Sequence, residues 1–139
     1  MRHQDEDSFL KPNTPMELAQ LMYSGNLEAV RGFIESNPAI VNQPDDRGFT
    51  PLILATYLNK KDITELLLEK GAQINAQDAA GNTALMGVSF KGFADLANLL
   101  IKQGADFSIQ NNEGETALSF AQKHNQSEIE AILKDAMKI

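Results

Sequence analysis

The chain has 139 residues, which is enough for one compact domain or for about four short structural repeats. It contains no cysteine, which excludes disulfides and thiolate chemistry, and its net charge of −7 disfavours nucleic acids and anionic membrane surfaces as partners. No apolar run approaches the roughly 20 residues of a membrane span, and the start, MRHQDEDSF, lacks the apolar segment of a signal peptide. We therefore expect a cytoplasmic protein that binds neither nucleic acid nor membrane.

The first 13 residues are polar and contain the acidic run Asp5, Glu6 and Asp7. We interpret residues 1–13 as a mobile polar arm. The arm is either a solvated tail or a segment that binds a partner, and the sequence alone leaves both interpretations open.

Residues 14–44 predict two helices separated by a break at Gly25 and Asn26. Thr14 and Glu17 have the spacing of a capping box at the start of the first helix. The second helix ends before Pro38, because the residue preceding a proline avoids the helical region. Apolar residues recur at helical spacing in both segments: Leu18, Leu21 and Met22 in the first, then Leu27, Val30, Phe33 and Ile34 in the second.

A turn sequence then recurs at a fixed distance along the chain. GFTPL at 48–52 returns as GNTAL at 81–85 and as GETAL at 114–118, so the offsets are 81 − 48 = 33 and 114 − 81 = 33. Each copy predicts a turn, a threonine that caps a first helix, and then a second helix. In the last copy, Ser127 and Glu130 also have capping-box spacing, which predicts the start of the final helix.

This pattern resembles the ankyrin repeat, whose signature is Thr-Pro-Leu-His-x-Ala on a 33-residue period. The best match is Thr50-Pro51-Leu52-Ile53-Leu54-Ala55. The resemblance implies an all-α solenoid of stacked helix-turn-helix repeats, joined by β-turn or hairpin loops, over residues 14–139. Its four repeats would be 14–44 as the N-terminal cap, 45–77, 78–110, and 111–139 as the C-terminal cap. The family's helix-start histidine, which normally braces the turn, is replaced by Ile53, Met86 and Ser119.

No set of residues predicts catalysis, a metal site or a cofactor. The histidines, His3 and His124, are dispersed and lack spaced partners, and no phosphate-binding glycine motif is present. Turn formation accounts for Asp45, Asp46 and Asp78 better than calcium binding does. Gly87 lies inside a predicted helix, where it either admits a neighbouring backbone or a ligand, or reflects sequence drift. We expect a protein that is not an enzyme.

The resemblance implies that a partner protein contacts the turn tips and the exposed face of the first helices. Tyr23, Tyr57, Phe90 and Lys123 are spaced by 34, 33 and 33 residues, so stacking would align them in a row. The aromatic rings either form a binding hot spot or shield the core. The full predicted site comprises Tyr23, Asp46, Arg47, Phe49, Tyr57, Leu58, Asn82, Phe90, Lys91, Glu113, Glu115 and Lys123.

Two functions remain after these exclusions. The first is a monomeric, non-catalytic module that binds another protein through this groove, as an adaptor or an inhibitor. The acidic tips Asp46, Glu113 and Glu115 would favour a partner with apolar anchors and some basic charge. The alternative is an accessory or structural subunit that uses the same surface for permanent homo- or hetero-oligomerisation.

Overall fold

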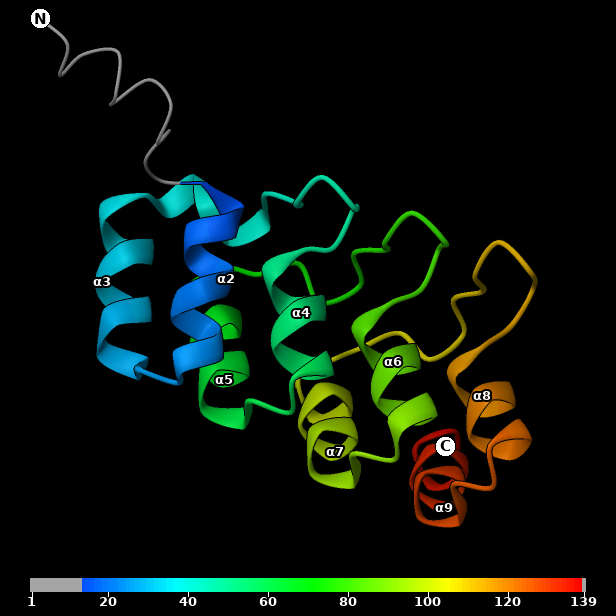
Figure 1. The fold of residues 1–139 in the computed structure, drawn as a ribbon. Helices are drawn as coiled ribbons and strands as arrows, with labels where there is room; N and C mark the ends of the chain where they lie inside the picture. The colour runs from blue at the N-terminus through cyan, green and yellow to red at the C-terminus, as the bar shows by residue number, and fades with distance from the viewer. Residues whose placement is uncertain (1–13, 139) are drawn as a thin grey trace, which may run out of the picture.

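The computed structural model describes residues 14–138, so the predicted arm at 1–13 lies outside the described residues. Helices and turns make up the described part of the chain, which contains no strand (Figure 1). In chain order the elements are α2 (Pro15–Ser24), α3 (Leu27–Ser36), the 3-10 helix η1 (Pro38–Asn42), α4 (Pro51–Tyr57), α5 (Lys61–Glu69), α6 (Ala84–Lys91), α7 (Ala94–Lys102), α8 (Ala117–Lys123) and α9 (Ser127–Ala136).

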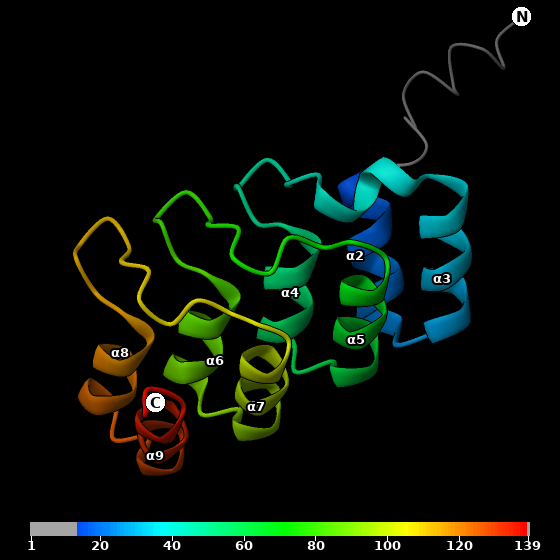
Figure 2. The same ribbon diagram turned by 180° about the vertical axis from the view of Figure 1, so that it is seen from behind.

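The helices form two layers. In Figures 1 and 2, α2, α4, α6 and α8 stand side by side in one layer, and α3, α5, α7 and α9 stand in the other. Each first helix packs against the second helix of its own pair and against the first helix of the next pair. The loops before α4, α6 and α8 project together from one end of the stack. The predicted all-α solenoid is confirmed.

Threonines begin the first helix of every pair, as predicted. The side chains of Thr14, Thr50, Thr83 and Thr116 each accept a hydrogen bond from the backbone N–H three residues later. Thr14 and Glu17 form the expected capping box. The capping box predicted from Ser127 is wrong. Ser127 is already the first residue of α9, because Gln126 N–H bonds to Ala121 O at 2.8 Å and turns the chain one residue earlier.

The core lies between the two layers. Leu18, Leu67, Leu96 and Leu133 are fully buried there, one from each pair of helices. Ala55 and Ala121 are also fully buried, and their small side chains let the first helices approach their neighbours closely. Burial at the rate of about 25 cal/mol per Å² of apolar surface is what holds the stack together.

The turns are braced by a side-chain oxygen that recurs every 33 residues. Asp45 Oδ1 accepts bonds from the N–H groups of Arg47 and Phe49, both at 2.9 Å. Asp78 Oδ1 does the same for Ala80 and Asn82, and Asn111 Oδ1 for Glu113 and Glu115. An amide therefore replaces a carboxylate in the last turn without loss of either bond.

Neighbouring turns are joined unequally. Asn112 N–H bonds to Ala80 O and Asn112 Nδ2 to Ala79 O, both at 3.0 Å, and Asn111 Nδ2 bonds to Asn82 Oδ1 at 2.9 Å. These bonds tie the turn before α8 to the turn before α6. Within residues 14–138, no hydrogen bond joins residues 45–49 to residues 78–82. The tips of the turns before α4 and α6 therefore meet by packing alone. Further back, Asn42 joins the same two loops, because its Nδ2 donates to Gly71 O at 3.0 Å and its Oδ1 accepts from Gln73 N–H at 2.8 Å.

Candidate partner-binding groove

Three aromatic rings are exposed on the layer of first helices. Tyr23 lies near the end of α2, Tyr57 ends α4 and Phe90 lies near the end of α6, with 61%, 54% and 44% of their surfaces exposed. Among large apolar or aromatic side chains in the described chain, only Met16 is comparably exposed. The stacked geometry therefore leaves these rings largely uncovered.

A groove of about 480 Å³ lies beside this row, between α4, α6 and the loops that precede them. Predicted site residues contribute to its lining: Tyr23, Arg47, Phe49, Tyr57, Asn82 and Phe90. The other predicted residues lie outside the lining: Asp46, Leu58, Lys91, Glu113, Glu115 and Lys123. Asp46 and Glu113 are exposed at the turn tips.

Phe49 and Leu58 differ from what the sequence predicts. The turn-tip position of Phe49 predicts an exposed ring, but the ring is half-buried, and the Arg47 guanidinium carbon lies 4.8 Å from its centre. The position of Leu58 late in its repeat predicts a side chain on the open groove face. Leu58 is instead half-buried against the core, as the C-cap that follows the last residue of α4. Neither residue is a freely accessible anchor.

Lys91 lies against the aromatic row rather than in the groove. Its Nζ is 4.7 Å from the centre of the Tyr57 ring and 5.8 Å from that of Phe93. A lysine over an aromatic face is held by the negative potential of the ring. Lys91 thus covers part of one face of Tyr57 and brings a positive charge to the edge of the groove.

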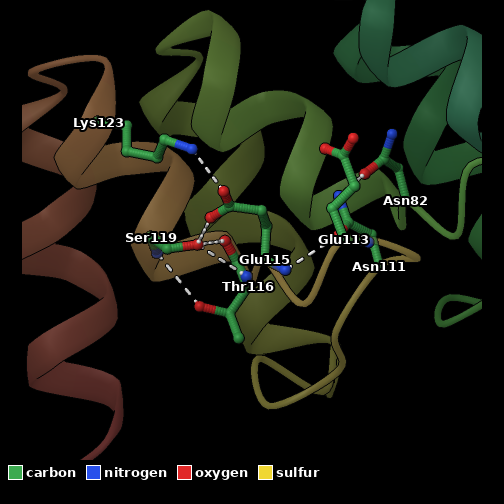
Figure 3. Close-up of polar contacts among 7 residues, drawn as sticks. All are labelled: Asn82, Asn111, Glu113, Glu115, Thr116, Ser119 and Lys123. Atoms are coloured by element: carbon green, nitrogen blue, oxygen red, sulfur yellow. Dashed lines mark hydrogen bonds and ion pairs between the residues drawn. The ribbon is translucent and has the colours of Figure 1, made fainter.

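The negative charge of Glu115 is compensated by side chains of its own chain (Figure 3). It accepts a hydrogen bond from Ser119 Oγ at 2.6 Å and forms an ion pair with Lys123. The bond from Lys123, supported by Ser119, holds the pKa of Glu115 below its usual value, and Glu115 in turn raises the pKa of Lys123. Glu115 is thus half-buried and already paired, whereas the Lys123 side chain is 59% exposed, and contact of either residue with a partner stays a prediction.

Asp45 and Asp78 occupy equivalent positions, since 78 − 45 = 33, but their surroundings differ. Asp45 pairs with Arg47 at 3.0 Å. Burial opposes ionisation of Asp45, but the bonds from Phe49 N–H and from Arg47 outweigh it, so its pKa lies below the usual value. Ala80 stands where Arg47 would repeat, and within residues 14–138 no lysine or arginine pairs with Asp78. Asp78 lines the groove with its charge uncompensated.

A cluster of rings at one end of the groove lies partly outside the predicted site. The helical pattern predicts Phe120 as a core residue, but Phe120 lines the groove and meets Phe90 edge to face, with ring centres 6.4 Å apart. The ring of His124 lies outside the lining, 4.5 Å from that of Phe90, and stacks on Phe120. Gly87 lines the groove at the position that holds Leu54 and Phe120 one period away on either side. The 33-residue spacing of Leu54, Gly87 and Phe120 is the sequence signal that could have placed Phe120 and Gly87 in the groove.

The part of the chain that the structure describes offers no other kind of site. No group of three or more His, Cys, Asp or Glu side chains there could hold a metal ion. No helix within residues 14–138 is both long enough and apolar enough to cross a bilayer.

Comparison with known proteins agrees with the fold. Residues 2–78 match the model of ankyrin repeats in three copies, and residues 80–112 match that of a single ankyrin repeat. The chain belongs to the ankyrin-repeat family. Ankyrin repeats generally bind other proteins and are typically non-catalytic.

Two similar curated proteins each match this ankyrin-repeat chain over 57 residues. The human DNA-binding protein RFXANK is 37% identical over 57 residues, which cover 41% of this chain and 22% of that protein. The BTB/POZ domain-containing protein 3 of Schizosaccharomyces pombe is 33% identical over 57 residues, or 41% of this chain and 11% of that protein. The match thus spans less than a quarter of either relative.

Proposed function

We propose that this ankyrin-repeat chain binds one partner protein through the groove between α4 and α6 and the aromatic row beside it, as an adaptor or an inhibitor does. The observation that carries the proposal is the exposure of Tyr23, Tyr57 and Phe90 in register on successive first helices. A ring whose purpose is to shield the core would be mostly covered. Rings left open beside a groove are typical of binding hot spots.

A protein fits this surface better than a nucleic acid does. The name of RFXANK describes that protein as DNA-binding, but the chain carries a net charge of −7 and its groove contains the uncompensated Asp78. Affinity for a phosphate backbone depends on many lysine and arginine contacts. In this groove the only basic side chain of the lining, Arg47, is paired with Asp45.

The test is capture of a partner from the native cell extract with three baits. They are the wild type, a Tyr57→Ala/Phe90→Ala variant, and Met16→Ala, which removes an exposed apolar side chain outside the groove. We expect the wild type and Met16→Ala to capture the same protein and the double variant to lose it. Each hot spot contributes about 2 kcal/mol, so calorimetry with the purified partner should show a loss of at least roughly 30-fold.

Equal capture by all three baits, each checked for folding by circular dichroism, would contradict the proposed surface. Sedimentation velocity over a range of concentrations separates the proposal from permanent self-association. A stable dimer of the pure wild type that dissociates in the double variant would assign the surface to an oligomer interface instead.

A further inference from the structure

We propose that Gly87 opens a notch in the groove that receives one large apolar side chain from a segment of the partner protein, with a lysine or arginine of that segment beside Asp78. This inference rests on the proposed function and states what the bound segment must contain. It is carried by three observations: the space at Gly87, the absence of an internal reason for a glycine there, and the uncompensated charge of Asp78.

The notch exists because one side chain is missing from a repeating row. Leu54, Gly87 and Phe120 occupy the same position in successive first helices, since 87 − 54 = 33 and 120 − 87 = 33. Leu54 is buried and Phe120 is half-buried, and both line the groove together with Gly87. Tyr57 and Phe90 stand in the same lining. The gap at Gly87 is therefore flanked by apolar and aromatic groups.

Nothing inside the described chain requires a glycine at this place. Gly87 lies within α6 with an ordinary negative φ, and a Cβ added to it would meet no heavy atom within 4 Å. A glycine inside a helix costs about 1 kcal/mol of stability relative to alanine. The space that this glycine leaves open is filled by no group of the described chain, and a side chain of a partner would fill it.

The negative charge of Asp78 near the notch favours a basic residue next to the apolar anchor of the bound segment. Asp78 lines the groove without a cationic partner among residues 14–138, whereas Arg47 is paired with Asp45 and lies over Phe49. A basic side chain next to the apolar anchor would therefore gain a partner, and an acidic one would be repelled. The same rule makes residues 1–13 of this chain a weaker occupant: they hold Phe9 beside Lys11, but Arg2 and Lys11 are outnumbered by Asp5, Glu6 and Asp7, so the net charge of the segment is 2 − 3 = −1. It also disfavours a second copy, because each copy carries −7.

The test begins with random linear peptides displayed on phage and selected on the immobilised full chain. Enriched peptides should share a large apolar residue with a lysine or arginine within a few positions. A synthetic, fluorescently labelled peptide of that sequence is then titrated by anisotropy against six proteins. They are the wild type, Gly87→Leu, Gly87→Ala, Asp78→Asn, Gly32→Leu and Tyr57→Ala/Phe90→Ala.

Gly32→Leu is the matched control. Gly32 is an exposed glycine within α3, outside the groove, and a Cβ there also meets nothing within 4 Å. We expect Gly87→Leu to weaken the affinity for the peptide by about 10-fold or more, as the loss of a hot-spot contact does. Gly87→Ala fills less of the notch and favours the helix, so it keeps the test valid if Gly87→Leu fails to fold. It should weaken binding of the peptide by less than Gly87→Leu does. Gly32→Leu should bind like the wild type.

Asp78→Asn isolates the charge. The amide keeps the acceptor for Ala80 and Asn82, as Asn111 shows in the next turn. We expect a loss of roughly two- to five-fold, the range of a partly exposed ion pair. The loss should vanish when the basic residue of the peptide is replaced by alanine.

Four results would overturn the inference. Selection that enriches no peptide, or only peptides without a large apolar residue, would show that the notch takes no such anchor. A peptide that binds Gly87→Leu like the wild type but loses affinity to Tyr57→Ala/Phe90→Ala would refute the notch and leave the groove standing. A peptide indifferent to both variants would refute both. A wild-type dimer in sedimentation velocity that Gly87→Leu dissociates would make a second copy the occupant.

Discussion

Gly81 and Gly114 occupy the same place in successive turns and have nearly the same backbone conformation, with φ of 85° and 78°. Their surroundings differ. A Cβ on Gly81 would lie 2.6 Å from Asn112 Oδ1, 2.8 Å from Asn112 N and 3.0 Å from the Cα of Asn111. A Cβ on Gly114 would meet nothing within 4 Å. Alanine at both positions therefore separates the cost of the left-handed backbone from the cost of crowding the next turn.

The magnitudes follow from these contacts. A left-handed alanine costs about 1–2 kcal/mol at either position. At Gly81 two of the three crowding atoms belong to the backbone, which yields less readily than a side chain, and overpacking of this kind adds about 1–3 kcal/mol. The Asn112 N–H bond to Ala80 O would also be strained. We expect Gly81→Ala to lower the free energy of unfolding by roughly 1–3 kcal/mol more than Gly114→Ala does.

Urea unfolding followed by far-ultraviolet circular dichroism measures both variants against the wild type. The comparison holds if the slope of the free energy against urea stays constant, because the same surface is then exposed in each case. Gly32→Ala is the control for substitution itself, since Gly32 is helical and uncrowded, and it should gain up to about 1 kcal/mol. Equal losses for Gly81→Ala and Gly114→Ala would refute the role assigned to turn stacking.

Three further predictions concern single residues. Asp78→Ala should lose about 2 kcal/mol of unfolding free energy, because two backbone N–H groups lose their acceptor, whereas Asp78→Asn should stay close to the wild type in the same urea assay; similar losses for both variants would contradict this account of the turn. Gly87→Ala should stabilise the chain by about 1 kcal/mol, seen in calorimetry as a rise in Tm of roughly 4 °C, and a fall in Tm would mean that the helix needs the glycine. Glu115 has a folded-state pKa below its usual 4.5, so its contribution is complete above the unfolded-state pKa and is lost as the pH falls through the folded one. Glu115→Gln should therefore be less stable than the wild type at neutral pH, and the difference measured by thermal unfolding should close in acid; a gap that persists there would rule out the ion pair with Lys123 as its cause.

The regular features of this chain are readable from its sequence because they repeat. The capping threonines and the 33-residue period predict the helix starts and the alignment of Tyr23, Tyr57 and Phe90. How far each side chain is exposed depends on neighbouring side chains that the 33-residue period does not determine. Phe49 lies against Arg47, and Phe120 is half-buried yet lines the groove together with Gly87, its neighbour in the row. These are contacts between particular side chains, which the three-dimensional structure shows and the repeat pattern does not.

The unequal joining of the turns bears on the mechanics of the stack. The turns before α6 and α8 are pinned to each other through Asn111 and Asn112, while residues 45–49 and 78–82 share no hydrogen bond. The tip before α6 is therefore fixed by hydrogen bonds on one side and only packed on the other. Arg47 and Phe49 on one tip, with Asp78 and Asn82 on the next, line the groove. A change in the spacing of these two tips would change the width of that end of the groove, while Asn42 still joins the two loops at their base.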